Sequence, residues 1–222
     1  MIDIKQQIKA DYRAEAPVYE VDYGHDIPLE AVPLYVADIH EILVGTPSLQ
    51  ALDVGCGTGF HTDALLQCGY SVTGVDFAPE MVTLAQTTYP NIRFQLVNDI
   101  EDAANFYAPE TFDLISCKQV ACHFTDPIQT FQEWRRWLKP GGSVAIVEAI
   151  WFRDHWQGRY KTYPDHLPLS CTQTWATIAY MLEKAGFEVS SYWLNRINGY
   201  EAVRTISTGG RPLVRYMVVG KK

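Results

Sequence analysis

The chain has 222 residues, of which 47% are hydrophobic and 20% are charged, and its formal net charge is −8 at pH 7. These proportions are typical of a globular domain with a full core, and they exclude a chain that is disordered throughout. The negative charge argues against nucleic acid or an anionic membrane surface as the main partner, because both favour clustered Lys and Arg. We therefore expect a small-molecule partner, no nucleic acid and no membrane.

The cysteines and the hydropathy pattern indicate a compartment. The five cysteines are an odd number and none are spaced as CxxC, so neither a disulfide framework nor a zinc site is expected. No run of 18 apolar residues is present, and the charged first residues do not resemble a signal peptide. The sequence thus predicts a cytoplasmic location, reduced thiols and no metal site.

Residues 1 to 47 have a mixed pattern. Ile4, Ile8 and Tyr12 recur at helical spacing, and residues 29–43 show a second helical pattern that ends at Gly45. We expect this part to form a helical segment on the substrate side of a domain over residues 48–222.

From residue 48 on, predicted strands and helices alternate. Strands are expected over 48–54, 71–76, 91–97, 112–116, 143–149, 188–194 and 213–219, and helices over 62–68, 79–87, 127–138 and 174–185. This alternation is typical of βαβ units, and it predicts an α/β fold with a parallel sheet covered on both faces. The pattern lapses from residue 150 to 170, where Trp, Tyr and His are frequent, so we predict a cap-like insert at about residues 150–173.

The segment Leu52–Gly59, LDVGCGTG, is a predicted strand that runs into a glycine turn and a helix. Such turns bind nucleotide-like ligands, because glycine lets the ligand approach the backbone. A dinucleotide-binding turn has glycines at its first, third and sixth positions, whereas here the sixth position is Phe60. Asp53 would also repel a pyrophosphate. An acid suits an ammonium, and S-adenosylmethionine carries an ammonium, a carboxylate and a sulfonium but no phosphate.

Asp76 lies 21 residues beyond Gly55, at the end of the second predicted strand. A carboxylate in this position can accept hydrogen bonds from both hydroxyls of a ribose. The glycine turn, the acid and the strand order together predict a site for S-adenosylmethionine.

The chain resembles the class I S-adenosylmethionine-dependent methyltransferases, in particular the small-molecule branch that includes the ubiquinone/menaquinone-biosynthesis type. The resemblance covers about residues 48 to 150 and is carried by LDVGCGTG, GVDFAPEMV, VNDIED, FDLISCKQVACHF and WLKPGGSVAIVE. It implies a three-layer α-β-α sandwich with a mainly parallel seven-stranded sheet whose last strand is antiparallel.

The resemblance also implies a set of cofactor-binding residues. Asp53, Gly55, Cys56 and Gly57 belong at the methionine end, Asp76 at the ribose, Asp99 and the backbone of Ile100 at the adenine edge, Phe77 and Met81 at the adenine faces, and the carbonyl of Lys118 at the methionine ammonium. From the residues alone, Met81 is equally a core residue, and Asp99 equally a helix cap or turn residue.

Three residues are candidates for catalysis. His123 follows the fourth strand and faces the ligand crevice, where it acts either as a general base or as a structural histidine. Glu148 ends the fifth strand, and it either attracts an amine or caps the strand. Tyr19, with Tyr12 and Tyr23, resembles the family's aromatic lid over the cofactor.

The aromatic residues of the predicted insert leave two alternatives open. They are Trp151, His155, Trp156, Tyr160, Tyr163 and His166. Such side chains either enclose an apolar or cationic substrate or form the small core of the cap itself.

The sequence therefore predicts a methyltransferase that acts on a nitrogen or oxygen of a small molecule, as a monomer or a homodimer. The alternatives are carbon methylation of a quinone-like ring and a non-catalytic partner subunit that only binds S-adenosylmethionine. The glycine spacing opposes a dehydrogenase.

Overall fold

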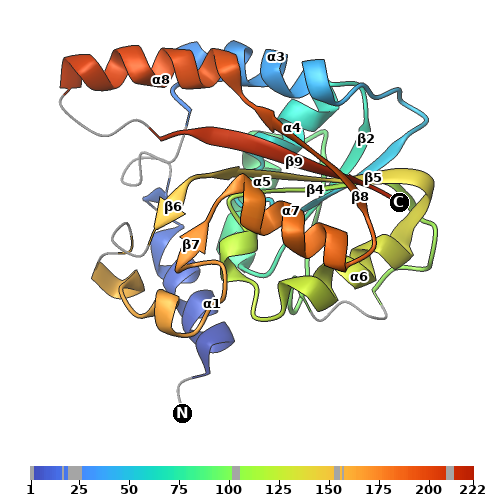
Figure 1. The fold of residues 1–222 in the computed structure, drawn as a ribbon, viewed down its shortest axis with the longest axis horizontal. Coiled ribbons are helices and arrows are strands. Elements are labelled where there is room, and N and C mark those ends of the chain that lie inside the picture. The colour runs from blue at the N-terminus through green and yellow to red at the C-terminus, as the bar shows by residue number, and fades with distance from the viewer. Residues whose placement is uncertain are drawn as a thin grey trace.

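The computed structural model describes residues 3–16, 18–19, 27–101, 106–152, 156, 158–208 and 213–222. Two residues discussed above, Tyr23 and His155, lie outside the described residues. The described part is a three-layer sandwich in which one sheet is covered by helices on both faces (Figure 1). The predicted fold class is confirmed.

The main sheet has seven strands in the order β3-β2-β1-β4-β5-β9-β8. They are β1 (Gln50–Val54), β2 (Ser71–Asp76), β3 (Arg93–Leu96), β4 (Phe112–Lys118), β5 (Leu138–Ala149), β8 (Glu188–Trp193) and β9 (Arg215–Lys221). Strands β1 to β5 pair in parallel, and β9 pairs in antiparallel fashion with β5 on one side and with β8 on the other. The last strand is antiparallel, as the family resemblance implies.

The predicted helices are present, and each is longer or shorter than predicted by a few residues at most. The described helices are α1 (Ile4–Glu15), α3 (Val32–Ile42), α4 (Phe60–Gln67), α5 (Pro79–Thr88), α6 (Pro127–Trp137), α7 (Trp175–Lys184) and α8 (Asn195–Thr208), with the short 3-10 helices η1 (Leu29–Ala31), η2 (Ala121–His123), η4 (Gly158–Tyr160) and η5 (Tyr163–Asp165). Of these, α8, η2, η4 and η5 lie beyond the prediction. Asp126 and Thr174 cap α6 and α7, because their side chains accept hydrogen bonds from first-turn amides.

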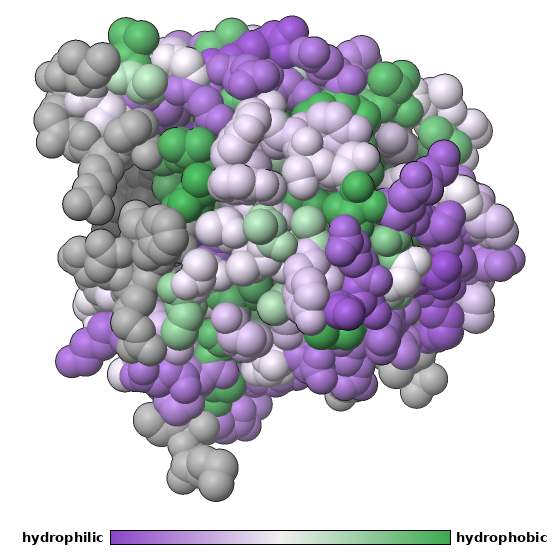
Figure 2. Space-filling model, viewed as in Figure 1, coloured by the Kyte–Doolittle hydropathy of each residue, from purple (hydrophilic) through white to green (hydrophobic). Residues whose placement is uncertain are grey.

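Alternate residues of the central strands point to opposite faces of the sheet and pack into two separate hydrophobic cores. Ile115 packs with the inner faces of α6 and α7, whereas the adjacent Leu114 packs with α3, α4 and α8. On the face shown in Figure 2, hydrophilic residues gather over α8 and α6, and paler residues lie over α7 between them. This burial on both faces explains why the strands form near-continuous apolar runs in the sequence.

The start of β5 differs from the prediction. Residues 139–142, which the prediction leaves between the helix over 127–138 and the strand over 143–149, lie inside the strand, because Leu138 pairs with Phe112 before the register shifts and Ser143 pairs with Leu114. The helix α6 accordingly ends one residue earlier than predicted, at Trp137.

The helix α8 is absent from the sequence prediction. Asp38 of α3 accepts hydrogen bonds from the backbone amides of Arg196 and Ile197, and so caps α8 from a distant part of the chain. The buried face of α8 includes Glu201, whose Oε1 lies 3.5 Å from Nη1 of Arg215 in β9. Because a charged residue stands at this buried position of α8, the apolar spacing that predicts a helix is interrupted in the sequence.

The insert also contains regular structure that was not predicted. A two-stranded antiparallel ribbon, β6 (Trp151–Phe152) with β7 (Thr172–Gln173), closes it at its base. In Figure 1 the insert and α1 lie side by side at one edge of the molecule, and Tyr163 and Leu167 of the insert share a core with Ile8 of α1. The segment 1–47 thus contributes to two parts of the molecule, because α1 packs on the insert and α3 packs on the main domain.

Candidate active site

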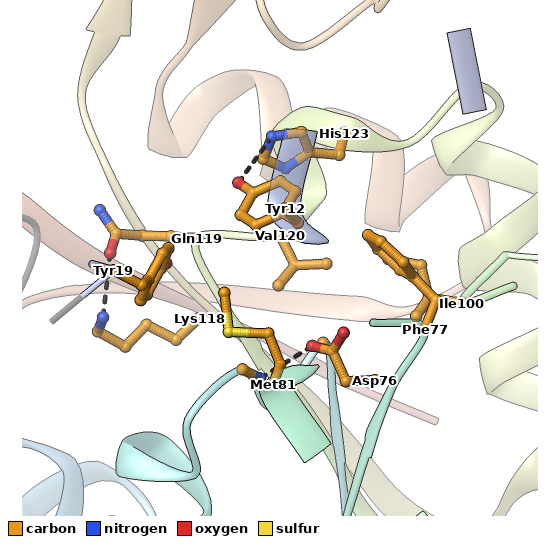
Figure 3. A pocket seen from close by; sticks show the side chains of 12 residues that line it. Tyr12, Tyr19, Asp76, Phe77, Met81, Ile100, Lys118, Gln119, Val120 and His123 are labelled. Carbon is orange, nitrogen blue, oxygen red and sulfur yellow. Dashed lines mark hydrogen bonds between the residues drawn. The ribbon is translucent and has the colours of Figure 1, made fainter. Parts of the chain in front are cut away.

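A cleft of about 430 Å³ opens where β1, β2 and β4 end. It is lined by Tyr12, Tyr19, Gly55, Gly57, Asp76, Phe77, Met81, Ile100, Lys118, Gln119, Val120 and His123 (Figure 3). In open parallel sheets, ligands bind outside the carboxyl ends of the strands, so the position is that of a ligand site.

The glycine turn forms the floor of the cleft. Gly55 has φ +69°, and a Cβ atom there would lie 2.6 Å from Cγ2 of Val120. Gly57 has φ +53° and no atom within 4 Å of its Cβ position, so its backbone is open to the cleft. The first glycine is therefore needed for packing and the second for access to the main chain.

Asp76 joins the turn to β2. One carboxylate oxygen accepts from the Gly57 amide at 2.9 Å and the other from the Ala78 amide at 2.8 Å. Burial raises the pKa of this carboxyl to about 6, against the opposing effect of these amides. Asp76 thus holds the turn in place and faces the cleft with its remaining acceptor capacity.

Asp53 lies beneath the turn and is fully buried. Oδ2 accepts from the Thr62 hydroxyl at 2.6 Å, whereas Oδ1 has no hydrogen-bond partner among the described residues. Burial raises its pKa to about 7. A buried carboxylate oxygen without a partner favours a cationic or donor group nearby.

Five other predicted cofactor residues lie in three places. Phe77, Met81 and Ile100 form an apolar wall of the cleft. Cys56 instead points into a small cluster with Val82, Ala85 and Phe94. Asp99 lines an adjoining cavity of about 280 Å³, where it accepts from Lys5 Nζ at 3.0 Å.

At the far end of the wall, Tyr12 of α1 meets His123. The Tyr12 hydroxyl lies 3.1 Å from His123 Nε2, and the ring centroids are 5.3 Å apart at 82°. The other ring nitrogen, Nδ1, lies 3.2 Å from Cys122 Sγ. Burial raises the pKa of the Tyr12 hydroxyl well above its usual value, so this hydroxyl keeps its proton. Tyr19 packs on Tyr12, with ring centroids 6.2 Å apart.

Glu148 does not line the cleft. It lies behind η2, where one oxygen accepts from the Ala121 amide at 2.9 Å and the other from Gln173 Nε2 at 2.5 Å. Burial raises its pKa to about 8. This position indicates that Glu148 fixes the turn that carries His123 rather than contacting an acceptor.

The insert aromatics pack among themselves and on α1. Trp156 donates to the Ser170 carbonyl at 2.7 Å, and the Tyr163 hydroxyl donates to Asp11 at 2.8 Å. None of Trp156, Tyr160 and Tyr163 lines the cleft, and His166 is exposed. Of the two alternatives, these contacts favour a core shared by the cap and α1.

Sequence reasoning missed Gln119 and Val120 as cleft residues. Both follow Lys118 directly, and the only signal was their position after the end of β4. Within the described ranges no group of three or more His, Cys, Asp or Glu side chains could hold a metal ion. Nor does any described helix have the length and apolar character that a membrane crossing requires.

Residues 52–146 match the methyltransferase-domain family. This segment of the chain is therefore similar to a methyltransferase domain. The match agrees with the predicted family and with S-adenosylmethionine as the predicted cofactor of this segment.

The relatives of the methyltransferase domain include the ubiquinone biosynthesis O-methyltransferase of Xanthomonas campestris pv. campestris. It is 33% identical over 126 residues, which are 55% of this chain and 52% of that protein. The chain thus spans about half the length of the curated relatives it matches.

Solved structures share the fold. A SAM-dependent methyltransferase from Aquifex aeolicus aligns with a TM-score of 0.62 at 16% identity, over 100% of this chain and 99% of that one. The cyclase SpnF aligns with a TM-score of 0.68 at 18% identity, over 98% and 96% of the two chains. Because a cyclase shares it, the fold alone does not identify the reaction.

Proposed function

We propose that the protein transfers the methyl group of S-adenosylmethionine to an oxygen or nitrogen atom of a small molecule. The observation that carries this proposal is the hydrogen bond between Tyr12 and His123 at one end of a cleft whose floor is Gly57 and Asp76. The name of the O-methyltransferase relatives favours oxygen as the acceptor atom.

The residues of the cleft fit the cofactor. Asp76 has acceptor capacity for the ribose hydroxyls, and the open backbone at Gly57 allows close approach. The unpaired Oδ1 of Asp53 supports an ammonium nearby, held directly or through water. Phe77, Met81 and Ile100 offer an apolar wall to an adenine ring. When bound, the cofactor supplies a methyl group that its sulfonium activates.

The chain then has to position the acceptor and remove its proton. With His123 in the tautomer whose Nε2 carries no proton, the Tyr12 hydroxyl donates to Nε2, and its oxygen can accept a proton from an acceptor O–H or N–H in the cleft. As that proton reaches Tyr12, the phenolic proton passes to His123, which becomes an imidazolium. Tyr12 and His123 thus serve as one proton-accepting unit, and Tyr19 covers the same end of the cleft.

The test is release of S-adenosylhomocysteine with a panel of phenols, amines and carboxylic acids. His123→Ala and Tyr12→Phe should each lower kcat by about 100-fold while S-adenosylhomocysteine binds as before. Because the two residues act as a unit, the double variant should be no slower than the slower single variant.

His40→Ala, an exposed position on α3, is the matched control and should leave the rate unchanged. A phenol already ionised at the assay pH should depend less on His123. Binding of S-adenosylhomocysteine without turnover of any acceptor would favour the non-catalytic alternative, and equal loss of cofactor binding in His123→Ala would assign that residue to structure.

A further inference from the structure

Lys118 and Gln119 lie together in the wall of the cleft. Both side chains line it, as do Gly55 and Gly57, and in Figure 3 they lie at the end away from Phe77 and Ile100. Lys118 Nζ donates to Gln119 Oε1 at 3.0 Å and lies 5.5 Å from the centroid of the Phe60 ring. This places a cationic group beside the glycine turn.

Lys118 is the only Lys or Arg among the described residues that line this cleft. Its charge acts on the groups below the turn. It lowers the pKa of the Asp53 carboxyl against the larger, raising effect of burial, and it adds to burial in lowering the pKa of His61 to about 3. The ammonium group is therefore close enough to influence the floor of the site.

Gln119 has an unusual backbone. Its φ is +57°, a left-handed conformation that residues other than glycine seldom adopt. Its amide donates to the Val147 carbonyl at 2.9 Å, which fixes the residue beside β5. Strained residues of this kind persist where the surrounding structure over-determines them, and they gather at ligand sites. The conformation turns the side chain into the cleft, where Oε1 holds Lys118 and Nε2 is a second donor.

The charges of the cofactor suggest what this pair binds. The ammonium suits Asp53, and a lysine at the same end would repel the ammonium and the sulfonium unless it meets the carboxylate. We propose that Lys118 Nζ and Gln119 Nε2 bind the α-carboxylate at the methionine end of the cofactor. The inference rests on the proposed function and assigns to the Lys118 side chain a role beyond its backbone carbonyl.

The test compares two ligands by calorimetry, without an acceptor. S-adenosylhomocysteine carries the carboxylate, and decarboxylated S-adenosylhomocysteine keeps the ammonium but lacks the carboxylate. Lys118→Met should weaken binding of the first ligand by about 10-fold or more, and it should leave binding of the second unchanged or make it tighter, because the repulsion of the ammonium is removed. Lys118→Arg, which keeps the charge, should retain most of the preference for the carboxylate.

Two substitutions by glycine separate the effect of a lost ligand contact from the effect of relieved backbone strain. Gln119→Gly removes the side chain and relieves the left-handed backbone, so it should weaken S-adenosylhomocysteine while raising the melting temperature. Glu110→Gly is the matched control. Glu110 also has φ +57° but is exposed in the turn before β4, so this variant should raise the melting temperature without changing affinity.

Three results are decisive. If Lys118→Met weakens both ligands equally, or neither, the carboxylate assignment is wrong although the proposed function stands. If Gln119→Gly binds S-adenosylhomocysteine as tightly as the unmodified protein does, Gln119 is not part of the pair. If the unmodified protein binds neither ligand, the proposed function itself fails.

Discussion

Replacing Glu148 by Gln should make the protein less sensitive to rising pH. Glu148 is 1% exposed, and its carboxylate accepts hydrogen bonds from the Ala121 amide and from Gln173 Nε2. A glutamine of the same shape can accept from Ala121 and, once the Gln173 amide turns over, donate to Gln173 Oε1. That oxygen is buried and lacks a hydrogen-bond partner in the described structure. The substitution therefore removes a titratable group without leaving a cavity.

The size of the effect follows from the pKa of Glu148, which burial raises from 4.5 to about 8. The folded protein holds this proton more tightly than the unfolded chain does. Stability is therefore full below about pH 4.5 and falls as the pH rises towards about 8, by about 1.4 kcal/mol per pH unit. Between pH 5 and pH 7 the loss is about 2–3 kcal/mol, or about 5–10 °C in melting temperature for a chain of this length.

The assay is thermal unfolding followed by circular dichroism from about pH 5 to pH 8, in the unmodified protein and in Glu148→Gln. Asp53 and Asp76 also have raised pKa values and are present in both proteins, so the difference between the two curves isolates Glu148. As the pH rises, the melting temperature of Glu148→Gln should increase relative to that of the unmodified protein. Two parallel curves would refute the reasoning, because Glu148 would then be ionised in the folded protein throughout this range.

Four further substitutions give three predictions. Asp76→Asn should weaken S-adenosylhomocysteine by at least about 10-fold in calorimetry, and an unchanged affinity would show that this carboxylate does not meet the ribose. Gly57→Ala and Gly141→Ala both place a side chain at a positive φ with open space around it, so each should cost about 1 kcal/mol in urea unfolding. Only Gly57→Ala should also reduce cofactor affinity, and equal binding by both variants would contradict an open floor at Gly57. Lys5→Met removes the ion pairs with Asp99 at 3.0 Å and with Glu101 at 3.4 Å, so the amides of α1 should exchange faster with deuterium, and unaltered exchange would mean that these pairs do not hold the helix.

The parts of the site that could be predicted from sequence are those fixed locally. The glycine turn, Asp76 and the apolar residues after β2 follow from one strand, one turn and one helix start, and their spacing along the chain sets their spacing in space. The same locality explains why β1, β2 and β4 were predicted to within two residues. Strands buried on both faces leave a clear apolar run.

The parts that could not be predicted depend on contacts between distant segments. The partner of His123 is Tyr12, 111 residues earlier, and the cap of α8 is Asp38, which lies 158 residues before Arg196. Sequence spacing placed Glu148 at a strand end beside the crevice, but only the packing of β7 shows that its carboxylate faces Gln173. The predicted cytoplasmic location and oligomeric state stay predictions, and all five cysteines are free thiols.

The position of β9 between β5 and β8 has a consequence for synthesis of the protein. The other neighbour of β5 in the sheet, β4, is made before β5. Residues 188–193 of β8, however, emerge about 20 residues ahead of β9, the strand that joins β8 to the sheet. During translation, β5 therefore keeps an open edge and β8 has no strand to pair with until residues 215–221 leave the ribosome. A nascent chain stalled between these points carries two unpaired strand edges, the features that recruit chaperones or lead to aggregation.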